Sequence, residues 1–405
     1  MKILHVVPGL GSVYGGPSTS ITNLTKSLAR LDIEVDIVTT NANGCYQLNV
    51  PLQTWIQQDG YRIQYFPCLY MNDYKISMSM TNWLLWHIRD YDVVNTHAIF
   101  SYSNLPAYWI TKFFHIPNII HPHGMLDAWA LNYKNWKKIP YYNLIEKQAL
   151  QVAKAIRVLA YSEAESIKDL GLATPLAFIP NGIWQEDFAK LPDPEYFYQN
   201  FPQTRDKNLI LFLGRIDPKK GLDMLANAFS KIHDHFPKTH LVIAGPDNIG
   251  FLPTVKKYFV EAKCLDAVTF TGMLTDSLKT AALAAADIYV APSYSEGFSM
   301  SVLEGMASGL PCVITKACNF PEAADAEAAH VVNIDSGAIA NALIHCLTYP
   351  EEAKLMGDRA RQLVFEKYTW ENIALQMKQV YTNILDKNSM SAVSEIHPES
   401  EIIKI

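Results

Sequence analysis

Short apolar runs alternate with stretches of helical period along the first half of the chain. From these runs we predict seven strands, at residues 3–7, 34–39, 62–66, 92–96, 117–121, 155–159 and 176–179. Strands that alternate with helical segments are typical of a parallel, doubly wound sheet. The predicted fold class is therefore α/β.

The same alternation restarts after an irregular, proline-containing stretch that holds Pro192, Pro194 and Pro202. We predict six further strands there, near residues 209–213, 239–244, 267–271, 287–291, 311–314 and 329–332. A chain of 405 residues exceeds the size at which a single hydrophobic core stops growing. Two domains are therefore expected.

This pattern divides the chain into five segments. We expect a first Rossmann-like domain over residues 1–185, a linker over 186–207, a second Rossmann-like domain over 208–367, a final helix over 368–387 and a tail over 388–405. The tail is polar and aperiodic, which is the composition of a disordered segment.

Composition narrows the class of protein. The net charge of −6, without an arginine-rich tract, argues against nucleic acid as a partner. Six scattered cysteines form no C-x-x-C pair, which favours reduced residues in a cytoplasmic protein over a disulfide framework or a metal site. The N-terminal apolar run ends at Pro8, and no later run has the length of a membrane span, so neither a signal peptide nor a spanning helix is expected.

Two carboxylates stand out between residues 291 and 311. Glu296 follows a predicted strand in a glycine-containing loop, and Glu304 lies one turn into the next predicted helix. In open α/β sheets, phosphorylated ligands bind beyond the carboxyl ends of strands, beside helix N-termini. An ionised carboxylate there can accept hydrogen bonds from vicinal hydroxyls. The alternative is structural: Glu296 caps the loop and Glu304 is a solvated helix residue.

A second strand, glycine turn and helix carries fixed cations. The run over 209–213 is followed at once by Gly214, Arg215 and, five residues later, Lys220. Arginine binds phosphate oxygens bidentately and lysine supplies a mobile point charge, so the pair could neutralise a diphosphate leaving group. The alternative is a pair of ordinary surface cations.

Together the two motifs carry a family resemblance. L-G-R-x-x-x-x-K-G at Leu213 to Gly221, followed by E-G-F-S-x-x-x-x-E at Glu296 to Glu304, resembles the retaining glycosyltransferases of family 4 (group 1), which have the GT-B fold. The resemblance implies two Rossmann-like domains with parallel sheets that face each other across a cleft. It also implies that the first domain binds the acceptor, that the second binds the nucleotide sugar, and that the last helix crosses back to the first.

The family implies an activity and a set of roles. A hexosyl unit would pass from a nucleoside diphosphate sugar to a hydroxyl of a glycan or lipid-linked glycan, without a cofactor or an essential metal. Arg215 and Lys220 would hold the diphosphate, Glu304 the ribose, and Glu296 the sugar hydroxyls. The remaining implied donor-binding positions are Gly15, Gly16, Gly214, Gly272, Met273, Gly297, Phe298 and Ser299.

Gly15 and Gly16 lie in the loop after the first strand, before Pro17. The family has a two-glycine loop here, near the donor diphosphate; the alternative is a tight turn without a ligand. The same loop resembles a loosened dinucleotide fingerprint, but its spacing is wrong by one, and Thr39 and Thr40 end the second strand in place of an acid. An NAD-type oxidoreductase is therefore a distant alternative.

His121 and His123 end a predicted strand in the run I-I-H-P-H-G. In the family a histidine at this place contacts the donor sugar, and His123, in the H-G pair, matches best. A structural histidine is one alternative. A metal site is another, although no acidic or cysteine partner lies nearby. His97 could line the same region. In I-P-N-G-I the family continues with an acid, whereas this chain has Trp184.

Residues 129–160 combine six basic residues with aromatic ones and only one acid, Glu146. The basic residues are Lys134, Lys137, Lys138, Lys147, Lys154 and Arg157, and the aromatic ones include Trp129, Tyr133, Trp136, Tyr141 and Tyr142. This mixture suits peripheral contact with the inner face of an anionic membrane. A surface helix with its aromatic side chains turned inward is the alternative.

Two other functions use the same architecture. A sugar-nucleotide epimerase of the GT-B type would convert its donor without an acceptor. A non-catalytic subunit would bind the sugar nucleotide without transferring the sugar.

Overall fold

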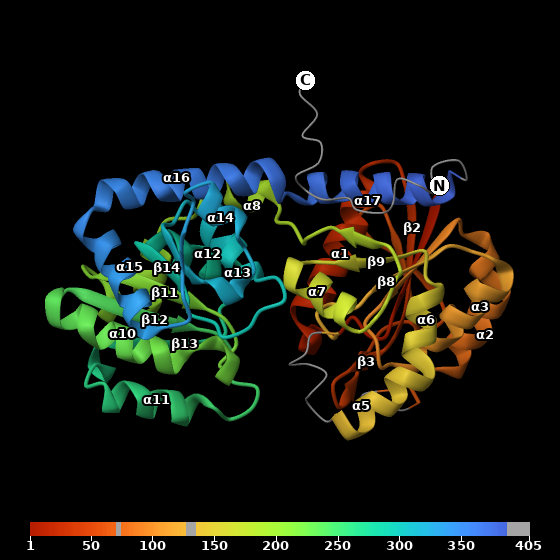
Figure 1. Ribbon diagram of the computed structural model, residues 1–405, viewed down its shortest axis with the longest axis horizontal. Helices are drawn as coiled ribbons and strands as arrows, with labels where there is room; N and C mark the ends of the chain where they lie inside the picture. The colour runs from red at the N-terminus through yellow and green to blue at the C-terminus, as the bar shows by residue number, and fades with distance from the viewer. Residues whose placement is uncertain (70–73, 127–134, 387–405) are drawn as a thin grey trace. The chain divides into compact units, whose positions relative to one another are not determined.

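The structure is a computed structural model that describes residues 1–69, 74–126 and 135–386 (Figure 1). The chain forms two compact units, one over Met1–Asn181 with the C-terminal segment from Trp370, the other over Gly182–Thr369. The predicted tail over 388–405 lies outside the described residues.

An eight-stranded sheet forms the centre of the first unit. Its strands lie in the order β10 (Leu176–Phe178), β9 (Ala155–Val158), β8 (Asn118–His121), β7 (Val93–His97), β1 (Lys2–Val7), β2 (Glu34–Thr40), β6 (Arg62–Phe66) and β5 (Trp55–Gln57). All neighbours are parallel except β5 and β6. The strand order reverses at β1, which lies between β2 and β7, so the loops after β1 and β7 diverge there.

The seven strands predicted for this half are confirmed to within one residue at each end. Three short strands were not predicted: β5 and the hairpin of β3 (Ala42–Asn43) and β4 (Tyr46–Gln47). Strands of two or three residues are too short to show a period in the sequence.

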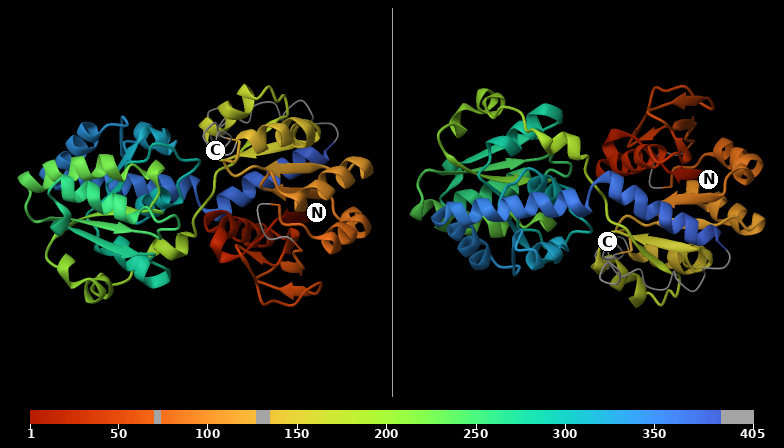
Figure 2. Two further views of the ribbon diagram at one scale, coloured as in Figure 1. Left: turned by 90° about the horizontal axis from the view of Figure 1, so that it is seen from below. Right: turned by 90° about the horizontal axis from the view of Figure 1, so that it is seen from above.

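Helices cover this sheet. They are α1 (Gly16–Ala29), α2 (Met78–His87), α3 (Leu105–Phe114), α5 (Asn135–Tyr141), α6 (Lys147–Val152), α7 (Tyr161–Asp169) and α17 (Trp370–Leu385). The last of these, α17, packs along α1 (Figure 2). The Ser27 hydroxyl donates to the Trp370 carbonyl at 2.8 Å, and Arg30 pairs with Glu371 at 2.9 Å. The C-terminal helix is therefore part of the first unit.

The second unit has a six-stranded parallel sheet. Its order is β13 (Val268–Gly272), β12 (Thr239–Ala244), β11 (Asn208–Leu213), β14 (Ile288–Ala291), β15 (Cys312–Thr315) and β16 (His330–Val332). These six predicted strands are also confirmed to within one residue at each end. Chain order reverses between β11 and β14, so the loops after these two strands leave the sheet at a switch point.

Both faces of this sheet are buried. Ile210 and Phe212 of β11 pack on one face, and Leu209, Leu211 and Leu213 on the other. The covering helices are α8 (Gln185–Ala189), α9 (Glu195–Asn200), α10 (Leu222–His235), α11 (Leu252–Glu261), α12 (Asp276–Ala285), α13 (Met300–Ala307), α14 (Glu322–Asp325), α15 (Ser336–Thr348) and α16 (Pro350–Lys367). Burial on both faces explains why these strands read as continuous apolar runs.

Residues 186–207, predicted as a linker, contain α8 and α9. Phe188 and Phe197 from these helices are 4% and 1% exposed, in the core of the second unit. The sequence did not predict these two helices, because helices of five or six residues are too short to show a clear helical period. The prolines and aromatic residues of the segment therefore read as irregular structure. The structure divides the chain earlier, between Asn181 and Gly182.

Candidate active site

The loop after β11 forms one side of the candidate site in the second unit. A short 3₁₀ helix, η6 (Pro218–Lys220), is capped by the Asp217 carboxylate, which accepts the Lys219 N–H at 3.1 Å. Gly221 then has a φ of 67°, and a Cβ there would lie 2.0 Å from the Pro292 carbonyl oxygen. Only glycine allows the loops after β11 and β14 to approach so closely.

Lys220 and Glu296 meet where these loops touch. The Lys220 ammonium donates to Glu296 Oε1 at 2.5 Å, and the Ser293 hydroxyl donates to the same oxygen at 2.7 Å. Glu296 is 9% exposed. The second oxygen, Oε2, makes no hydrogen bond with another described residue. One carboxylate oxygen thus anchors the lysine, and the other is left to accept hydrogen bonds from a ligand.

The backbone of the Glu296 loop is held by the segment after β15. The Glu296 N–H donates to the Ala317 carbonyl at 3.0 Å, and the Asn319 side-chain amide donates to the Glu296 carbonyl at 2.5 Å. Asn319 itself has a left-handed backbone, with a φ of 56°. The sequence analysis missed Asn319 and Ser293. Their signal is weak, because asparagine and serine after strands are ordinary turn residues.

Arg215 lies on the same loop as Lys220. Its side chain is exposed and makes no hydrogen bond or ion pair within residues 1–69, 74–126 and 135–386. Half-buried Lys219 lies on the same loop; burial lowers the pKa of its ammonium, the Glu296 carboxylate opposes that shift, and the charges of Lys220 and Arg215 add to it. The loop therefore presents an excess of positive charge.

Gly297, Phe298 and the N-cap residue Ser299 lie directly before the helix α13. Its first residues have free N–H groups, because Ser299 at the N-cap makes no side-chain capping bond. A Cβ on Gly297 would meet no atom within 4 Å. Phe298 packs on Tyr368 with ring centroids 6.1 Å apart. An open, uncapped helix N-terminus favours an anion.

Glu304 is paired, and Met273 is exposed. Lys279 of α12, which the sequence analysis did not single out, donates to Glu304 Oε1 at 2.7 Å. Gly272 ends β13 with a φ of 71°, and the Met273 side chain after it is 66% exposed. The N–H of Gly245, after β12, donates to the Gly272 carbonyl at 2.8 Å. The carboxyl edge of β12 and β13 is thereby fixed.

In the first unit, His123 ends a row of three hydrogen-bonded histidine rings. His5 Nδ1 lies 2.7 Å from His97 Nε2, and His97 Nδ1 lies 3.0 Å from His123 Nε2. His5 and His97 are 0% and 1% exposed, whereas His123 is only partly buried. His121 bonds separately to Asn95, with its Nε2 2.9 Å from Asn95 Oδ1.

These rings are uncharged at neutral pH. Burial lowers the pKa of His5 and of His123 to about 3, and the nearby Arg157 cation adds to both shifts. Burial also lowers the pKa of His97 and His121 well below the usual range. The Arg157 guanidinium is itself buried and donates to the Ile179 and Pro180 carbonyls at 2.9 and 2.6 Å.

Glu163 holds the backbone at His123. Its Oε1 accepts the Gly124 N–H at 2.7 Å and its Oε2 accepts the Leu159 N–H at 2.8 Å. His123 has a left-handed φ of 55°, which costs energy for a residue other than glycine. The H-G turn is therefore held in a strained form by a buried carboxylate. Glu163, in the first turn of α7, read in the sequence as an ordinary helix residue.

Gly15 and Gly16 begin α1. Gly15 has a φ of 63° and makes no side-chain cap, whereas Gly16 has ordinary helical geometry. A Cβ on either would meet no atom within 4 Å. Packing inside the first unit therefore does not explain why residue 16 is glycine.

Two family descriptions match the chain, and together they cover most of its length. The family description "Glycosyl transferases group 1" matches residues 197–383, and "Glycosyltransferase Family 4" matches residues 14–186. The chain belongs to the family 4, group 1 glycosyltransferases.

Curated relatives of the chain include two mannosyltransferases. The chain is 28% identical to the MMP alpha-(1->4)-mannosyltransferase of Mycolicibacterium hassiacum, over 60% of the chain and 57% of that protein. It is 30% identical to the phosphatidyl-myo-inositol mannosyltransferase of Mycobacterium leprae, over 53% of the chain and 56% of that protein. The aligned part thus spans little more than half the length of these relatives.

Among solved structures, sucrose-phosphate synthase from Thermosynechococcus elongatus superimposes with a TM-score of 0.75 at 21% identity, covering 95% of this chain and 99% of that one. Anabaena HepE in complex with UDP gives a TM-score of 0.72 at 16% identity, covering 94% and 100%. The fold is therefore GT-B.

In this member of the family the structure brings some of the predicted site residues together. Lys220 and Glu296 are in direct contact, and Arg215 lies on the Lys220 loop. Glu304 lies on the helix that follows Glu296, already paired with Lys279. His123, Gly15 and Gly16 belong to the other unit. The ligand roles of all these residues remain predictions.

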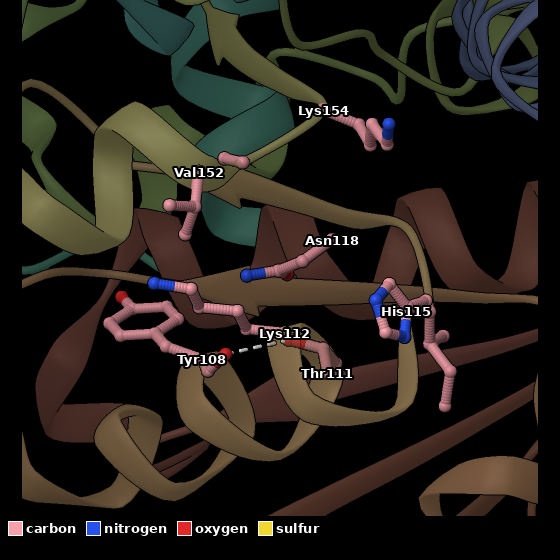
Figure 3. Close-up of a pocket in the computed structure, with 9 residues that line it drawn as sticks. Tyr108, Thr111, Lys112, His115, Asn118, Val152 and Lys154 are labelled. Atoms are coloured by element: carbon pink, nitrogen blue, oxygen red, sulfur yellow. Dashed lines mark hydrogen bonds between the residues drawn. The ribbon is translucent and has the colours of Figure 1, made fainter.

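A separate cavity of about 220 Å³ lies between α3 and α6 of the first unit (Figure 3). Tyr108, Lys112, His115 and Lys154 are among its lining residues, and none of the predicted site residues reaches it. The Lys112 and Lys154 amines point to opposite sides of the cavity, so their charges do not converge on one ligand (Figure 3).

Among the described residues, no group of three or more histidine, cysteine or acidic side chains is arranged to hold a metal ion. None of the helices within residues 1–69, 74–126 and 135–386 combines the length and the apolar character needed to cross a membrane.

Proposed function

We propose that this protein is a retaining glycosyltransferase that moves a hexosyl unit from a nucleoside diphosphate sugar to a hydroxyl acceptor. The observation that carries the proposal is the contact of Lys220 with Glu296 at the switch point of the second sheet, beside Arg215, which has no partner among the described residues. A loop with excess positive charge next to a carboxylate with one free oxygen suits a ligand that joins a diphosphate to a polyol.

The diphosphate would bind to Arg215, Lys220 and the N-terminus of α13. Arg215 is exposed and unpaired among the described residues, so its guanidinium fork is available to phosphate oxygens. Lys220 is fixed by Glu296, which places its charge without a further loss of side-chain freedom. These groups would stabilise the negative charge that develops on the leaving phosphate.

The sugar and the ribose would bind to the two carboxylates. Glu296 Oε2 would accept hydrogen bonds from sugar hydroxyls, while Oε1 stays with Lys220 and Ser293. Glu304 would bind the ribose hydroxyls beside its partner Lys279. In the first unit, neutral His123 would contact the sugar, and the open Gly16 would permit close approach of a ligand to the backbone.

The transfer would occur by attack on the same face as the leaving group. The acceptor oxygen bonds to the anomeric carbon as the bond from that carbon to the diphosphate breaks. The acceptor proton passes to the departing phosphate oxygen, so no covalent enzyme intermediate and no resident metal are required. Product anomeric configuration, determined by proton NMR, tests the retention; activity that survives a chelator tests the absence of a metal.

The acceptor is proposed to be a glycan or a lipid-linked glycan. The M. leprae relative is named as a mannosyltransferase for phosphatidyl-myo-inositol, which is a membrane lipid. In this chain α3 and the segment from α5 to α6 expose large apolar side chains: Trp109, Phe113, Trp136, Ile139, Leu144 and Val152. Lys112, Lys147 and Lys154 belong to the same helices or directly follow them.

Apolar and cationic side chains together suit the inner surface of an anionic bilayer. We therefore propose peripheral membrane contact through this surface. Trp129, Tyr133 and Lys134 of the predicted 129–160 segment lie outside the described residues. Flotation with vesicles that contain anionic lipid tests the contact, and salt-resistant binding lost in Phe113→Ser and Leu144→Ser would support it.

The decisive assay is acceptor-dependent release of nucleoside diphosphate. The full chain is incubated with UDP-, GDP- or ADP-hexoses, with and without glycan and lipid-linked acceptors. Release that requires an acceptor supports a transferase. Conversion of the donor sugar without an acceptor would support an epimerase instead, and donor binding without release or conversion would support a non-catalytic subunit.

A further inference from the structure

The row of histidine rings runs from the interior of the first unit to the partly exposed His123. His5 and His97 are fully buried, yet neither was needed for the proposed reaction. Buried polar side chains are costly unless they are hydrogen-bonded, and here their partners are each other. Such an arrangement requires a reason.

We infer that His97, backed by His5, is a positioning residue that fixes His123 as the tautomer with the proton on Nδ1. His123 then offers an N–H donor to an oxygen of the bound sugar. The inference rests on the proposed function for the identity of that oxygen, but the tautomer itself is a property of the protein alone.

The number of N–H protons on the three rings allows two arrangements of the two hydrogen bonds. Each ring is neutral and carries a single N–H. In one arrangement His5 Nδ1 donates to His97 Nε2, and His97 Nδ1 donates to His123 Nε2. In the other both hydrogen bonds point the opposite way, and His123 Nε2 is the first donor. The geometry of the nitrogen atoms alone allows either.

The interior end of the row distinguishes the two arrangements. His5 Nε2 is buried and has no hydrogen-bond partner among the described residues. In the second arrangement this atom would carry a buried, unpaired N–H, and orphaned buried N–H groups are rarer in proteins than orphaned acceptors. In the first arrangement it holds only a lone pair. The first arrangement is therefore favoured, and it leaves the proton of His123 on Nδ1.

Both His97 and His123 are fixed in place. The direction of the two hydrogen bonds therefore fixes His123 Nδ1–H as the donor. The Asn104 amide donates to the His97 and Ala98 carbonyls at 2.6 and 2.9 Å. The His97 and His123 rings meet edge to edge at their hydrogen bond, with centroids 5.3 Å apart and planes 26° apart. Glu163 holds the backbone after His123 through Gly124. Ring and backbone are thus restrained from different elements.

The test compares two replacements of His97. His97→Asn keeps an amide donor near the position of Nδ1, whereas His97→Leu removes the donor. His121→Leu is the matched control, because His121 is equally buried in the same cluster but bonds to Asn95 and not to His123. Nitrogen-15 NMR of the histidine side chains in the full chain identifies the protonated nitrogen of each ring, and donor turnover is measured in parallel.

We expect His123 to carry its proton on Nδ1 in the wild type, His97→Asn and His121→Leu, and to populate both tautomers in His97→Leu. We expect kcat to fall roughly 10-fold or more in His97→Leu, the loss typical when a residue that orients a metal-binding histidine is replaced, with KM little changed. His97→Asn should recover most of that loss.

A wild-type His123 protonated on Nε2 would overturn the inference, as would a folded His97→Asn that is as impaired as His97→Leu. Should His97→Leu fail to fold, the wild-type and His97→Asn spectra still decide. Because NMR needs no substrate, a protein with the expected tautomer but no transferase activity would refute the proposed function and leave the positioning role standing.

Discussion

The candidate site residues of the second unit are charged, whereas those of the first unit are neutral. Lys220 and Glu296 form a nearly buried ion pair, with Arg215 exposed beside them. His5, His97 and the partly buried His123 form a row without charge, because burial lowers the pKa of all three rings and the Arg157 cation adds to the shift. Fixed charges such as those of the second unit suit a diphosphate, whereas neutral donors such as those of the first unit suit hydroxyl groups because they attract no counter-ion.

The two regions also differ in how they are held. In the second unit glycine lets two loops touch, and a side-chain ion pair joins them. In the first unit left-handed residues other than glycine lie in the loops after β7 and β8: Ala98, Phe100 and His123 have φ values of 63°, 58° and 55°. Buried side chains restrain this strain, among them Asn104 and Glu163.

The largest expected effect comes from removing the cations of the second unit, where catalytic loss and loss of stability can be measured separately. Arg215→Ala and Lys220→Ala should each lower kcat/KM by about 10²-fold or more, because each removes a cation from the leaving group. Only Lys220→Ala should also lower the melting temperature, because the nearly buried Glu296 carboxylate then loses its ion-pair partner. Steady-state kinetics and thermal unfolding check both. Arg205→Ala, on a surface pair with Glu195, is the control with normal kinetics.

Normal turnover in Arg215→Ala would contradict the assignment of the diphosphate site. A double variant tests the pairing itself. Glu296→Gln in the Lys220→Ala background should recover part of the lost stability, because it neutralises the stranded carboxylate.

An effect of intermediate size tests whether Glu146, a buried acid of the first unit, is neutral like the histidine rings. Glu146 is 0% exposed at the end of a π-helical turn, η4 (Tyr142–Glu146), and burial raises the pKa of its carboxyl to about 7. Between pH 4.5 and 7 the unfolded chain is ionised at this residue and the folded one is protonated. Stability should therefore fall as the pH rises through this window, by at most about 3 kcal/mol.

Glu146→Gln should remove this pH dependence and keep the acceptor for the Phe100 N–H, which donates to Glu146 Oε1 at 2.7 Å. Urea unfolding at pH 5.5 and pH 8 checks it: the variant should be the more stable protein at pH 8. If the free energy of unfolding changes equally between the two pH values in both proteins, Glu146 stays ionised in the folded state.

The smallest effect distinguishes a backbone requirement from a ligand requirement at the start of α1. Gly15→Ala should cost about 1–3 kcal/mol of stability, because its φ of 63° disfavours a side chain. Gly16→Ala should leave the melting temperature unchanged, since a Cβ there meets no protein atom within 4 Å. It should raise the KM of the donor or the acceptor instead. An unchanged KM would mean that no ligand approaches Gly16.

The sequence predicted the second unit's site better than the first's, for a physical reason. Arg215, Lys220, Glu296 and Glu304 fall in two contiguous strand, loop and helix motifs, so the spacing along the chain carries the geometry. In a parallel sheet the carboxyl ends of β11 and β14 must also meet at one edge. The Lys220 contact with Glu296 was still not predicted, because both had been assigned only to the ligand.

The histidine row was largely hidden. His5, His97 and His123 come from β1, from β7 and from the turn after β8, and their contact depends on the order of these strands, which a single sequence does not reveal. His123 was singled out by resemblance, and His97 on weaker grounds. Glu163 and Asn104 act on backbone groups across tertiary contacts, and neither stands out from ordinary polar residues by type or spacing.

The most direct test of the central claim is donor binding to the full chain, measured by thermal shift with UDP-, GDP- and ADP-sugars on the wild type and on Arg215→Ala. The account predicts that one donor raises the melting temperature of the wild type and that Arg215→Ala, folded and equally stable without ligand, loses most of that shift. Stabilisation by none of the donors, or an equal shift in both proteins, would contradict the assignment of the charged site in the second unit to the nucleotide sugar.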